Sequence, residues 1–220
     1  MDIFTDASLN NRQNVAGVGV VFVPSSSPEA MVCHNSYCFS NNIETAELFA
    51  VAMALRLVSR QREGEVRIMV DSMTALIKIK HVFNSMGSGG MQGVDNPAER
   101  KIFYSMATSL FQMKNVTVSF QHIKGHQEDV SKYTDAYYNT LADEEARKGR
   151  KKAETIYSKS KQVVPSDMEW DIILEQKNCW KGVPKKVFFL FSENQQIPPQ
   201  TIARFGKKVE VDRGRQKVKR

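Results

Sequence analysis

Apolar and polar residues follow strand-like and helix-like periodicities along the first part of this chain. The apolar, β-branched run at 16–23 predicts a buried strand, and the looser alternation at 31–39 predicts the next one. Together with the segment at 1–8, these runs predict an antiparallel meander of three strands. Apolar residues at helical spacing between Thr45 and about Arg60 then predict a helix with one face on the sheet.

Strand and helix patterns alternate after this point. The expected elements, in chain order, are a strand at 66–71, a helix from Ser72, a helix at 98–113, a strand at 116–120, and a helix that begins at Thr134 or Asp135 and carries Arg147. A meander followed by strand–helix alternation predicts an α/β fold, with a mixed five-stranded sheet flanked by helices.

The distribution of charge divides the chain near residue 149. Residues 1–144 carry 12 Lys and Arg against 15 Asp and Glu, whereas residues 145–220 carry 19 against 9. An acidic body suits cations, and a basic extension suits a polyanion. The predicted division is a main domain at 1–149, a basic linker at 150–165, a small basic α+β accessory module at 166–212 with a strand at 187–191, and a basic disordered tail at 213–220.

Cysteine usage and hydropathy indicate the compartment. The three cysteines are too few and too scattered for a disulfide framework, which favours a reducing environment. No run approaches the roughly 18 apolar residues of a membrane-spanning helix, and no apolar leader precedes the first strand. We therefore expect a soluble protein of the cell interior, cytoplasmic or nucleoid-associated, that is neither secreted nor bound to a membrane.

Four acidic residues stand at the edges of the expected elements. They are Asp6 at the end of the first strand, Glu47 in the first turn of a helix, Asp71 at the end of the fourth strand, and Asp143 on the last helix. The first and fourth strands of a mixed sheet can be parallel neighbours, so Asp6 and Asp71 are expected to emerge side by side. Converging carboxylates repel one another and are stable with cations between them.

The residue types indicate which cations and which chemistry to expect. Hard carboxylate oxygens suit Mg²⁺, for which Mn²⁺ can substitute. Two such ions about 4 Å apart clamp the attacking and leaving oxygens of a phosphodiester. His126 follows a glycine in a polar loop and could shuttle a proton or assist product release. The pattern therefore predicts a metal-dependent phosphodiester hydrolase.

Five short motifs surround these residues in a fixed order. They are Phe4-Thr5-Asp6-Ala7-Ser8, Thr45-Ala46-Glu47-Leu48, Val70-Asp71-Ser72, Lys124-Gly125-His126 and Asn139-Thr140-Leu141-Ala142-Asp143. In this order they resemble the motifs of type 1 ribonuclease H, over residues 1–149. The resemblance implies an endoribonuclease that cuts the RNA strand of an RNA–DNA hybrid with two magnesium ions and leaves 3′-hydroxyl and 5′-phosphate ends. It also implies a mobile histidine at His126.

Two pairs of acids compete for places in this ligand set. Asp135 competes with Asp143 for the fourth place, and Asp143 is favoured because Asn139 precedes it by one helical turn, as in the family. Glu44 competes with Glu47, and the Ala-Glu-Leu context favours Glu47. Hydroxyl and amide groups that are candidates for lining the substrate groove belong to Ser8, Asn42, Ser72 and Asn139.

Two further functions remain open at this level. A nuclease on this fold can act on DNA instead of hybrids, and a non-catalytic module of the same fold can bind nucleic acid or a partner protein. The basic substrate-binding segment of some family members is absent, because residues 84–96 are rich in Ser and Gly. The basic residues of 150–220 are therefore the candidates for hybrid binding or for docking a protein partner.

Overall fold

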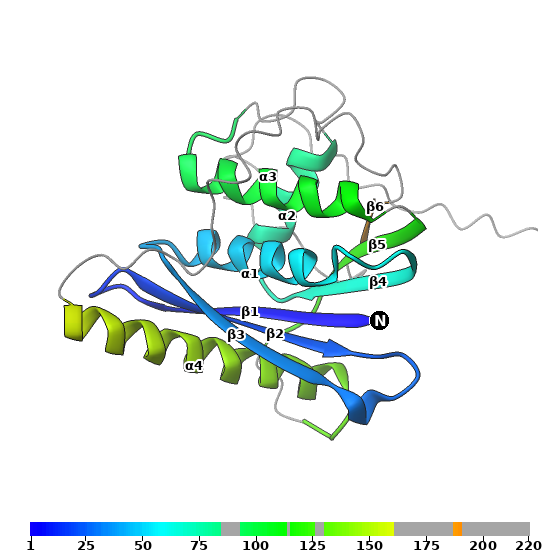
Figure 1. Ribbon diagram of the computed structural model, residues 1–220, viewed down its shortest axis with the longest axis horizontal. Coiled ribbons are helices and arrows are strands. Elements are labelled where there is room, and N and C mark those ends of the chain that lie inside the picture. The colour runs from blue at the N-terminus through cyan, green and yellow to red at the C-terminus, as the bar shows by residue number, and fades with distance from the viewer. Residues whose placement is uncertain (85–92, 114, 126–129, 161–186, 191–220) are drawn as a thin grey trace, which may run out of the picture.

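A computed structural model describes residues 1–84, 93–113, 115–125, 130–160 and 187–190 of the chain. A single sheet runs through the described part, with helices on both of its faces (Figure 1). Among these residues, no helix combines the length and the apolar character that crossing a lipid bilayer requires.

The sheet contains the five predicted strands and one more. In chain order the strands are β1 (Asp2–Asn10), β2 (Val15–Val23), β3 (Val32–Phe39), β4 (Glu63–Val70), β5 (Asn115–His122) and β6 (Val187–Leu190). Their spatial order is β3-β2-β1-β4-β5-β6. The first three strands pair antiparallel, and β4, β5 and β6 add in parallel. The predicted mixed five-stranded sheet is confirmed for β1–β5.

The sixth strand was expected as a strand, but not as part of this sheet. Val187 pairs with Val118 and Leu190 pairs with Gln121, so β6 lengthens the sheet beyond β5. Because the pairing is parallel, β6 points toward the same end of the sheet as β5. The accessory module at 166–212 and the tail at 213–220 otherwise lie outside the described residues, and their boundaries stay predictions.

Three helices cover one face of the sheet. They are α1 (Ile43–Val58), α2 (Met73–Asn84) and α3 (Pro97–Gln112). Helix α1 packs on β1 and β2, and α3 packs on α1 (Figure 1). Large side chains such as Phe49, Phe103 and Phe120 are fully buried between these layers. A short 3-10 turn, η1 (Pro28–Ala30), links β2 to β3.

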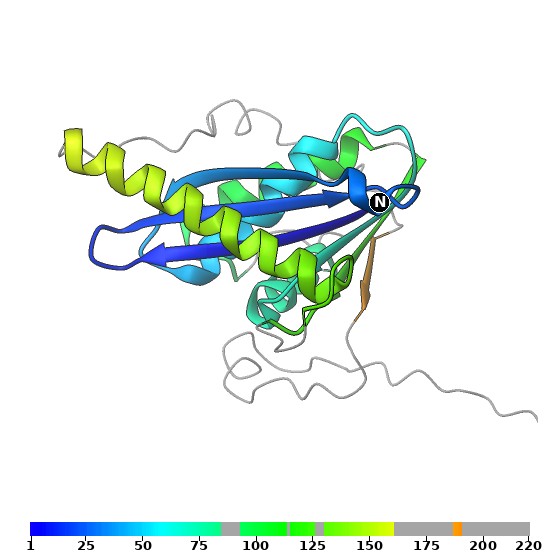
Figure 2. The same ribbon diagram turned by 90° about the horizontal axis from the view of Figure 1, so that it is seen from below.

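The opposite face is covered by the long helix α4 (Asp135–Ser160), which crosses β2, β1 and β3 (Figure 2). Its backbone lies very close to the sheet. A Cβ added at Gly19 would lie 2.0 Å from the carbonyl oxygen of Ala142, and one at Gly17 would lie 2.0 Å from that of Ala146. Small residues on both elements therefore fix the distance at which α4 carries Asp143 past β1 and β2.

Helix α4 also continues beyond the predicted start of the linker. Ala153 is fully buried against Val15 and Tyr37, and Asn10 donates its side-chain amide to Glu154 at 2.7 Å. Residues 150–160 are thus helical and packed on the main domain, and only residues 161–165 of the predicted linker lie outside the described part.

Candidate active site

The site forms where β1 and β4 separate. Their parallel pairing ends at Thr5 and Val70, so the next residue of each chain segment, Asp6 or Asp71, stands at the point of divergence. Strand β1 itself continues to Asn10 through its pairing with β2, in which Asp6 faces Gly19. The sequence predicted that Asp6 ends a strand. In the structure Asp6 lies inside β1, directly after the point where the parallel neighbour β4 ends.

Glu47 reaches the same point from the first face-covering helix. Asn42 caps α1 by accepting the backbone N–H of Glu44 at 2.8 Å. Glu44 is the acid of the first turn, and Glu47 lies at the start of the second turn, not in the first turn as the sequence predicted. Asp6, Glu47 and Asp71 each offer a carboxylate oxygen, and these three atoms lie within 4.8 Å of one another. Asp6 and Glu47 are 7% and 6% exposed, respectively, so this acidic cluster is largely shielded from water.

The environment favours the protonated forms of two of these acids. Burial, followed by the charges of Asp71 and Asp143, raises the pKa of Asp6 to about 8. The backbone N–H of Ala7, which donates to Asp6 at 2.7 Å, acts in the opposite direction and lowers this pKa. Burial and the charges of Asp6 and Asp71 likewise raise the pKa of Glu47 well above its usual value. The carboxyl groups of Asp6 and Glu47 also act on the pKa of each other.

Asp71 is contacted by the last residue of β5 and by the segment that follows it. The Nε2 atom of His122 lies 3.0 Å from the carbonyl oxygen of Asp71, and Ile123 donates its backbone N–H to Val70 at 3.0 Å. The backbone of Gly125 lies against the carboxylate, because a Cβ there would be 3.1 Å from Asp71 Oδ2. The backbone at Gly125 thus borders the site on the side of Asp71.

Asp143 approaches from α4 but does not join the group of three. Its Oδ2 atom forms an ion pair with Nη2 of Arg147 at 2.5 Å, one helical turn along. Its charge still contributes to the raised pKa of Asp6. Asp135 lies near the helix start, where it lines a solvent-open cavity of about 450 Å³ and acts on the pKa of Arg67.

The remaining candidates occupy several environments. Glu44, the competitor of Glu47, forms an ion pair with Lys78 instead of joining the acidic cluster. Asn42 and Ser72 use side-chain oxygens to cap helices, the latter by accepting the N–H of Ala75 at 3.2 Å. Asn139 is buried, and its Oδ1 atom has no hydrogen-bond partner.

Ser8 is half-buried on β1, two residues beyond Asp6. His126 lies outside the described residues, directly after Gly125.

Two residues that support the site were not predicted from the sequence. His122 supports the backbone of Asp71, and the only signal for it is its position in the β5 alternation beyond Phe120. Lys78 is buried beside α1, although its sequence context is that of an exposed lysine on a helix.

The donor atoms of the acidic cluster fit a divalent cation. All three groups offer carboxylate oxygens at spacings that one ion can bridge, and Glu47 Oε2 is buried without a hydrogen-bond partner. A buried acceptor that lacks a donor is costly unless a cation or a proton satisfies it. Hard oxygen ligands of this kind suit Mg²⁺ or Mn²⁺ better than softer metals.

Comparisons with known proteins agree with this geometry. The family model for RNase H matches residues 1–151. No curated protein sequence matches the chain. Among solved structures, the protease-reverse transcriptase of prototype foamy virus is 24% identical with a TM-score of 0.55, over 68% of this chain and 20% of that one. The chain therefore spans about a fifth of that viral protein.

Two single-domain structures resemble the chain over more of their own length. The solution structure of the prototype foamy virus RNase H domain is 24% identical with a TM-score of 0.54, over 68% of this chain and 93% of that one. LC11-RNase H1, solved in complex with an RNA/DNA hybrid, is 21% identical with a TM-score of 0.51, over 70% and 98%. At these identities the structures show a shared fold.

Proposed function

The chain belongs to the RNase H family, and from this premise we propose that it is a ribonuclease that hydrolyses the RNA strand of RNA–DNA hybrids with the help of divalent cations. The observation that carries the proposal is the acidic cluster. Asp6, Glu47 and Asp71 come from three separate elements, yet their oxygens lie within 4.8 Å of one another. A module that only bound nucleic acid would gain nothing from three mutually repelling acids next to its polyanionic ligand.

Four residues are proposed to hold two Mg²⁺ ions, for which Mn²⁺ can substitute. Asp6 would be a ligand of both ions, because Glu47, Asp71 and Asp143 all act on its carboxyl group. Asp143 would be the fourth ligand, and its carboxylate would then exchange the ion pair with Arg147 for a metal ion. When bound, the ions polarise the scissile phosphodiester and lower the pKa of water, which permits in-line hydrolysis at neutral pH.

The protein's own groups have three tasks in this proposal. The carboxylates position the reacting phosphate by fixing the cations at the edge where β1 and β4 diverge. His122 and Gly125 hold Asp71 in place. His126, the next residue, is proposed to move a proton at the leaving 3′ oxygen of the RNA and to assist product release. Hydrolysis at this oxygen gives 3′-hydroxyl and 5′-phosphate ends.

The direct test supplies a labelled RNA–DNA hybrid with Mg²⁺ to the full chain. Wild-type protein is expected to cut the RNA strand, and Asp71→Asn is expected to lose at least about 100-fold in rate, because the preorganised electrostatics of the site are lost. Asp135→Asn is the matched control, because Asp135 is an acid of α4 outside the cluster. Equal cleavage by the wild type and Asp71→Asn contradicts the proposal, and a preference for duplex DNA changes the substrate assignment.

The basic C-terminal part is proposed to hold the hybrid. Residues 145–220 carry 19 Lys and Arg against 9 Asp and Glu. Strand β6 supports this role, since it runs parallel to β5 and ends with Leu190 beside Gln121, one residue before His122. The chain beyond Leu190 therefore starts from the end of the sheet that carries the acidic cluster. A protein partner that docks on 150–220 is the alternative occupant.

A truncation after Ser160 tests this role; it keeps the whole of α4 and removes β6 from the edge of the sheet together with the basic extension. Ala153 is buried in the domain, so a cut at residue 150 would remove core packing together with charge. The truncated protein is expected to keep kcat, to show a higher KM for the hybrid, and to lose less affinity as salt is added, because fewer phosphates are neutralised. An unchanged KM and salt slope would favour the protein-docking alternative.

A further inference from the structure

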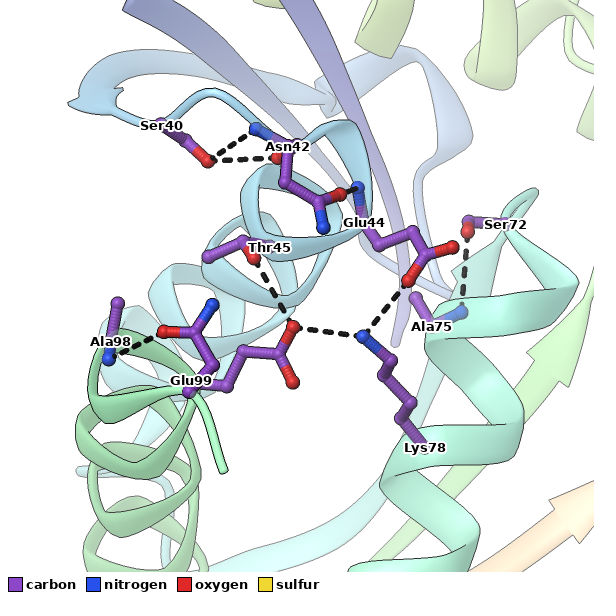
Figure 3. A network of polar contacts seen from close by, with 10 residues as sticks. Ser40, Asn42, Glu44, Thr45, Ser72, Ala75, Lys78, Ala98 and Glu99 are labelled. Atoms are coloured by element: carbon purple, nitrogen blue, oxygen red, sulfur yellow. Dashed lines mark hydrogen bonds and ion pairs between the residues drawn. The ribbon is translucent and has the colours of Figure 1, made fainter. Parts of the chain in front are cut away.

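A buried cluster of polar residues joins the three helices on the face that carries Glu47. Lys78 of α2 is 8% exposed, and its Nζ atom forms ion pairs with Glu44 Oε2 at 2.9 Å and with Glu99 Oε1 at 2.8 Å. Thr45 donates its hydroxyl to the same Glu99 oxygen at 3.2 Å (Figure 3). Helices α1, α2 and α3 therefore meet around one ammonium group, and we call these four residues the Lys78 cluster.

Stability alone is a weak reason for this arrangement. Removing an ammonium and two carboxylates from water costs several kcal/mol, and apolar replacements of the same volume often leave a protein as stable or more so. A buried ion-pair cluster does, however, restrict geometry, because its members are satisfied in one arrangement only. The Lys78 cluster is thus better suited to fixing the relative positions of the helices than to adding stability.

The elements that the cluster joins are the ones that carry two of the acids. Glu44 and Thr45 belong to the first turn of α1, and Glu47 lies at the start of the next turn. Lys78 lies on α2, which begins two residues after Asp71 and is capped by Ser72 (Figure 3). The ion pair between Lys78 and Glu44 therefore connects the helix that bears Glu47 directly to the helix that follows Asp71.

This ion pair opposes the repulsion among the three carboxylates of the acidic cluster. Asp6, Glu47 and Asp71 bring carboxylate oxygens within 4.8 Å of one another, and carboxylates this close repel one another when they carry charge. Repulsion of this kind favours separation of α1 from the strands that carry the other two acids. Lys78 holds Glu44, three residues before Glu47, against α2 and α3.

We propose that Lys78 is a positioning residue for the divalent-cation site, which keeps Glu47 at ligand distance from Asp6 and Asp71 by clamping the first turn of α1. This inference rests on the proposed function of the acidic cluster. It assigns a second buried charge group, outside that cluster, to the same task. Residues that orient metal ligands from outside the ligand set typically contribute about 10- to 100-fold to metal affinity or activity.

Two variants keep the test independent of folding. Lys78→Met alone leaves Glu44 and Glu99 buried without their cation and endangers the fold. The first variant is therefore the neutral triple Lys78→Met/Glu44→Gln/Glu99→Gln, which removes every charge and keeps the shapes. The second is Glu44→Gln, which releases α1 and preserves the Lys78–Glu99 pair.

The matched control breaks a different ion pair between two elements of the same sheet. Asp2 and Arg67 are paired at the start of β1, and each lies four residues before the acid that its strand leads to, Asp6 or Asp71. The double variant Asp2→Asn/Arg67→Met removes this pair. It is expected to change thermal stability without changing metal affinity.

The measurement is the Mn²⁺ dissociation constant of the full chain by titration calorimetry, with the melting temperature recorded in parallel. The triple variant is expected to bind Mn²⁺ about tenfold more weakly than wild type, Glu44→Gln is expected to lie between the two, and excess Mn²⁺ is expected to restore the cleavage rate. Affinities that stay within about threefold of wild type in both variants overturn the proposal, whatever happens to the melting temperature.

Failure of this proposal differs from failure of the proposed function. If wild type binds Mn²⁺ but cuts no hybrid, the functional proposal fails and Lys78 is still judged by the affinities. If wild type cuts the hybrid and the variants keep wild-type affinity, only the role of Lys78 fails.

Discussion

Replacement of Asp6 by Asn is expected to stabilise the metal-free protein while abolishing its activity. Asp6 is 7% exposed, and its pKa is raised from 3.8 to about 8, first by burial and then by the charges of Asp71 and Asp143. The folded state therefore binds a proton at Asp6 more tightly than the unfolded chain does. Asn has nearly the same shape and carries no charge, so it removes the cost of keeping this acid in its site.

The sign of the pH dependence follows from the direction of this shift. Below the unfolded value of 3.8 both states are protonated, and Asp6 costs nothing. As the pH rises from there to about 8, the unfolded chain gains from ionisation while the folded protein does not, so stability falls; above about 8 the cost is constant. At 1.36 kcal/mol per pKa unit, the cost near pH 7 is at most about 4 kcal/mol.

The measured gain of Asp6→Asn is expected to be smaller than this limit. Asp6 and Glu47 act on the pKa of each other, so part of the cost belongs to the pair. We expect a gain of about 2 kcal/mol near pH 7, which raises the melting temperature by several degrees in a domain of this size. Near pH 4 the gain is expected to fall below about 0.6 kcal/mol.

The assay is urea unfolding followed by circular dichroism, in excess chelator, near pH 4, 7 and 8.5. Asp2→Asn is the control, since it breaks the ion pair with Arg67 and is expected to cost up to about 1 kcal/mol without a stabilising effect. Saturating Mn²⁺ is expected to stabilise wild type, because the ion binds the folded state only. A gain that does not grow from pH 4 to 8.5, or a loss of stability near pH 8.5, refutes the reasoning.

Three further predictions concern the border of the site at Gly125, the fourth ligand and the packing of α4 on β2. Gly125→Ala puts a Cβ 3.1 Å from Asp71 Oδ2 and is expected to lower kcat about tenfold or more, with little change in the melting temperature. Asp143→Asn is expected to lower hybrid cleavage at least about 100-fold, whereas Asp135→Asn stays within about twofold of wild type; the reverse ranking would exchange their roles. Gly19→Ala puts a Cβ 2.0 Å from a carbonyl oxygen of α4 and is expected to destabilise the fold by about 3 kcal/mol in urea unfolding, and a neutral effect would mean that α4 packs farther from β2.

Periodicity along the chain predicted the order of strands and helices and the parallel pairing of β1 with β4. Both depend on apolar runs such as 16–23 and on local connection rules, which sequence records directly. The position of Asp6 was only partly predictable. Asp6 lies where β4 ends, although β1 itself continues. The end of the neighbouring strand cannot be predicted from the local pattern around Asp6.

The length of α4 was missed for a different reason. The residues that face the sheet are small, including Ala142, Ala146, Gly149 and Ala153, because the helix lies so close to β2 and β3. Small residues give little hydrophobic periodicity, so the lysines and arginines at 147–152 dominated the pattern and suggested a linker. Close packing removed the signal that would have revealed the helix.

Tertiary contacts explain two other features that were not predicted, the place of β6 in the sheet and the burial of Lys78. The apolar run at 187–191 predicted a strand, but its pairing with β5 joins residues about 70 positions apart. Lys78 follows the apolar residues Leu76 and Ile77 on a short helix, and its burial depends on partners from two other helices. Such features become visible only when distant segments are placed together.

A crystal of the full chain with Mn²⁺ and a hybrid that it cannot cut tests the central claim most directly. The account predicts two anomalous-scattering peaks about 4 Å apart among Asp6, Glu47, Asp71 and Asp143, next to an RNA phosphate. The absence of such peaks among these four carboxylates at saturating Mn²⁺ would contradict it.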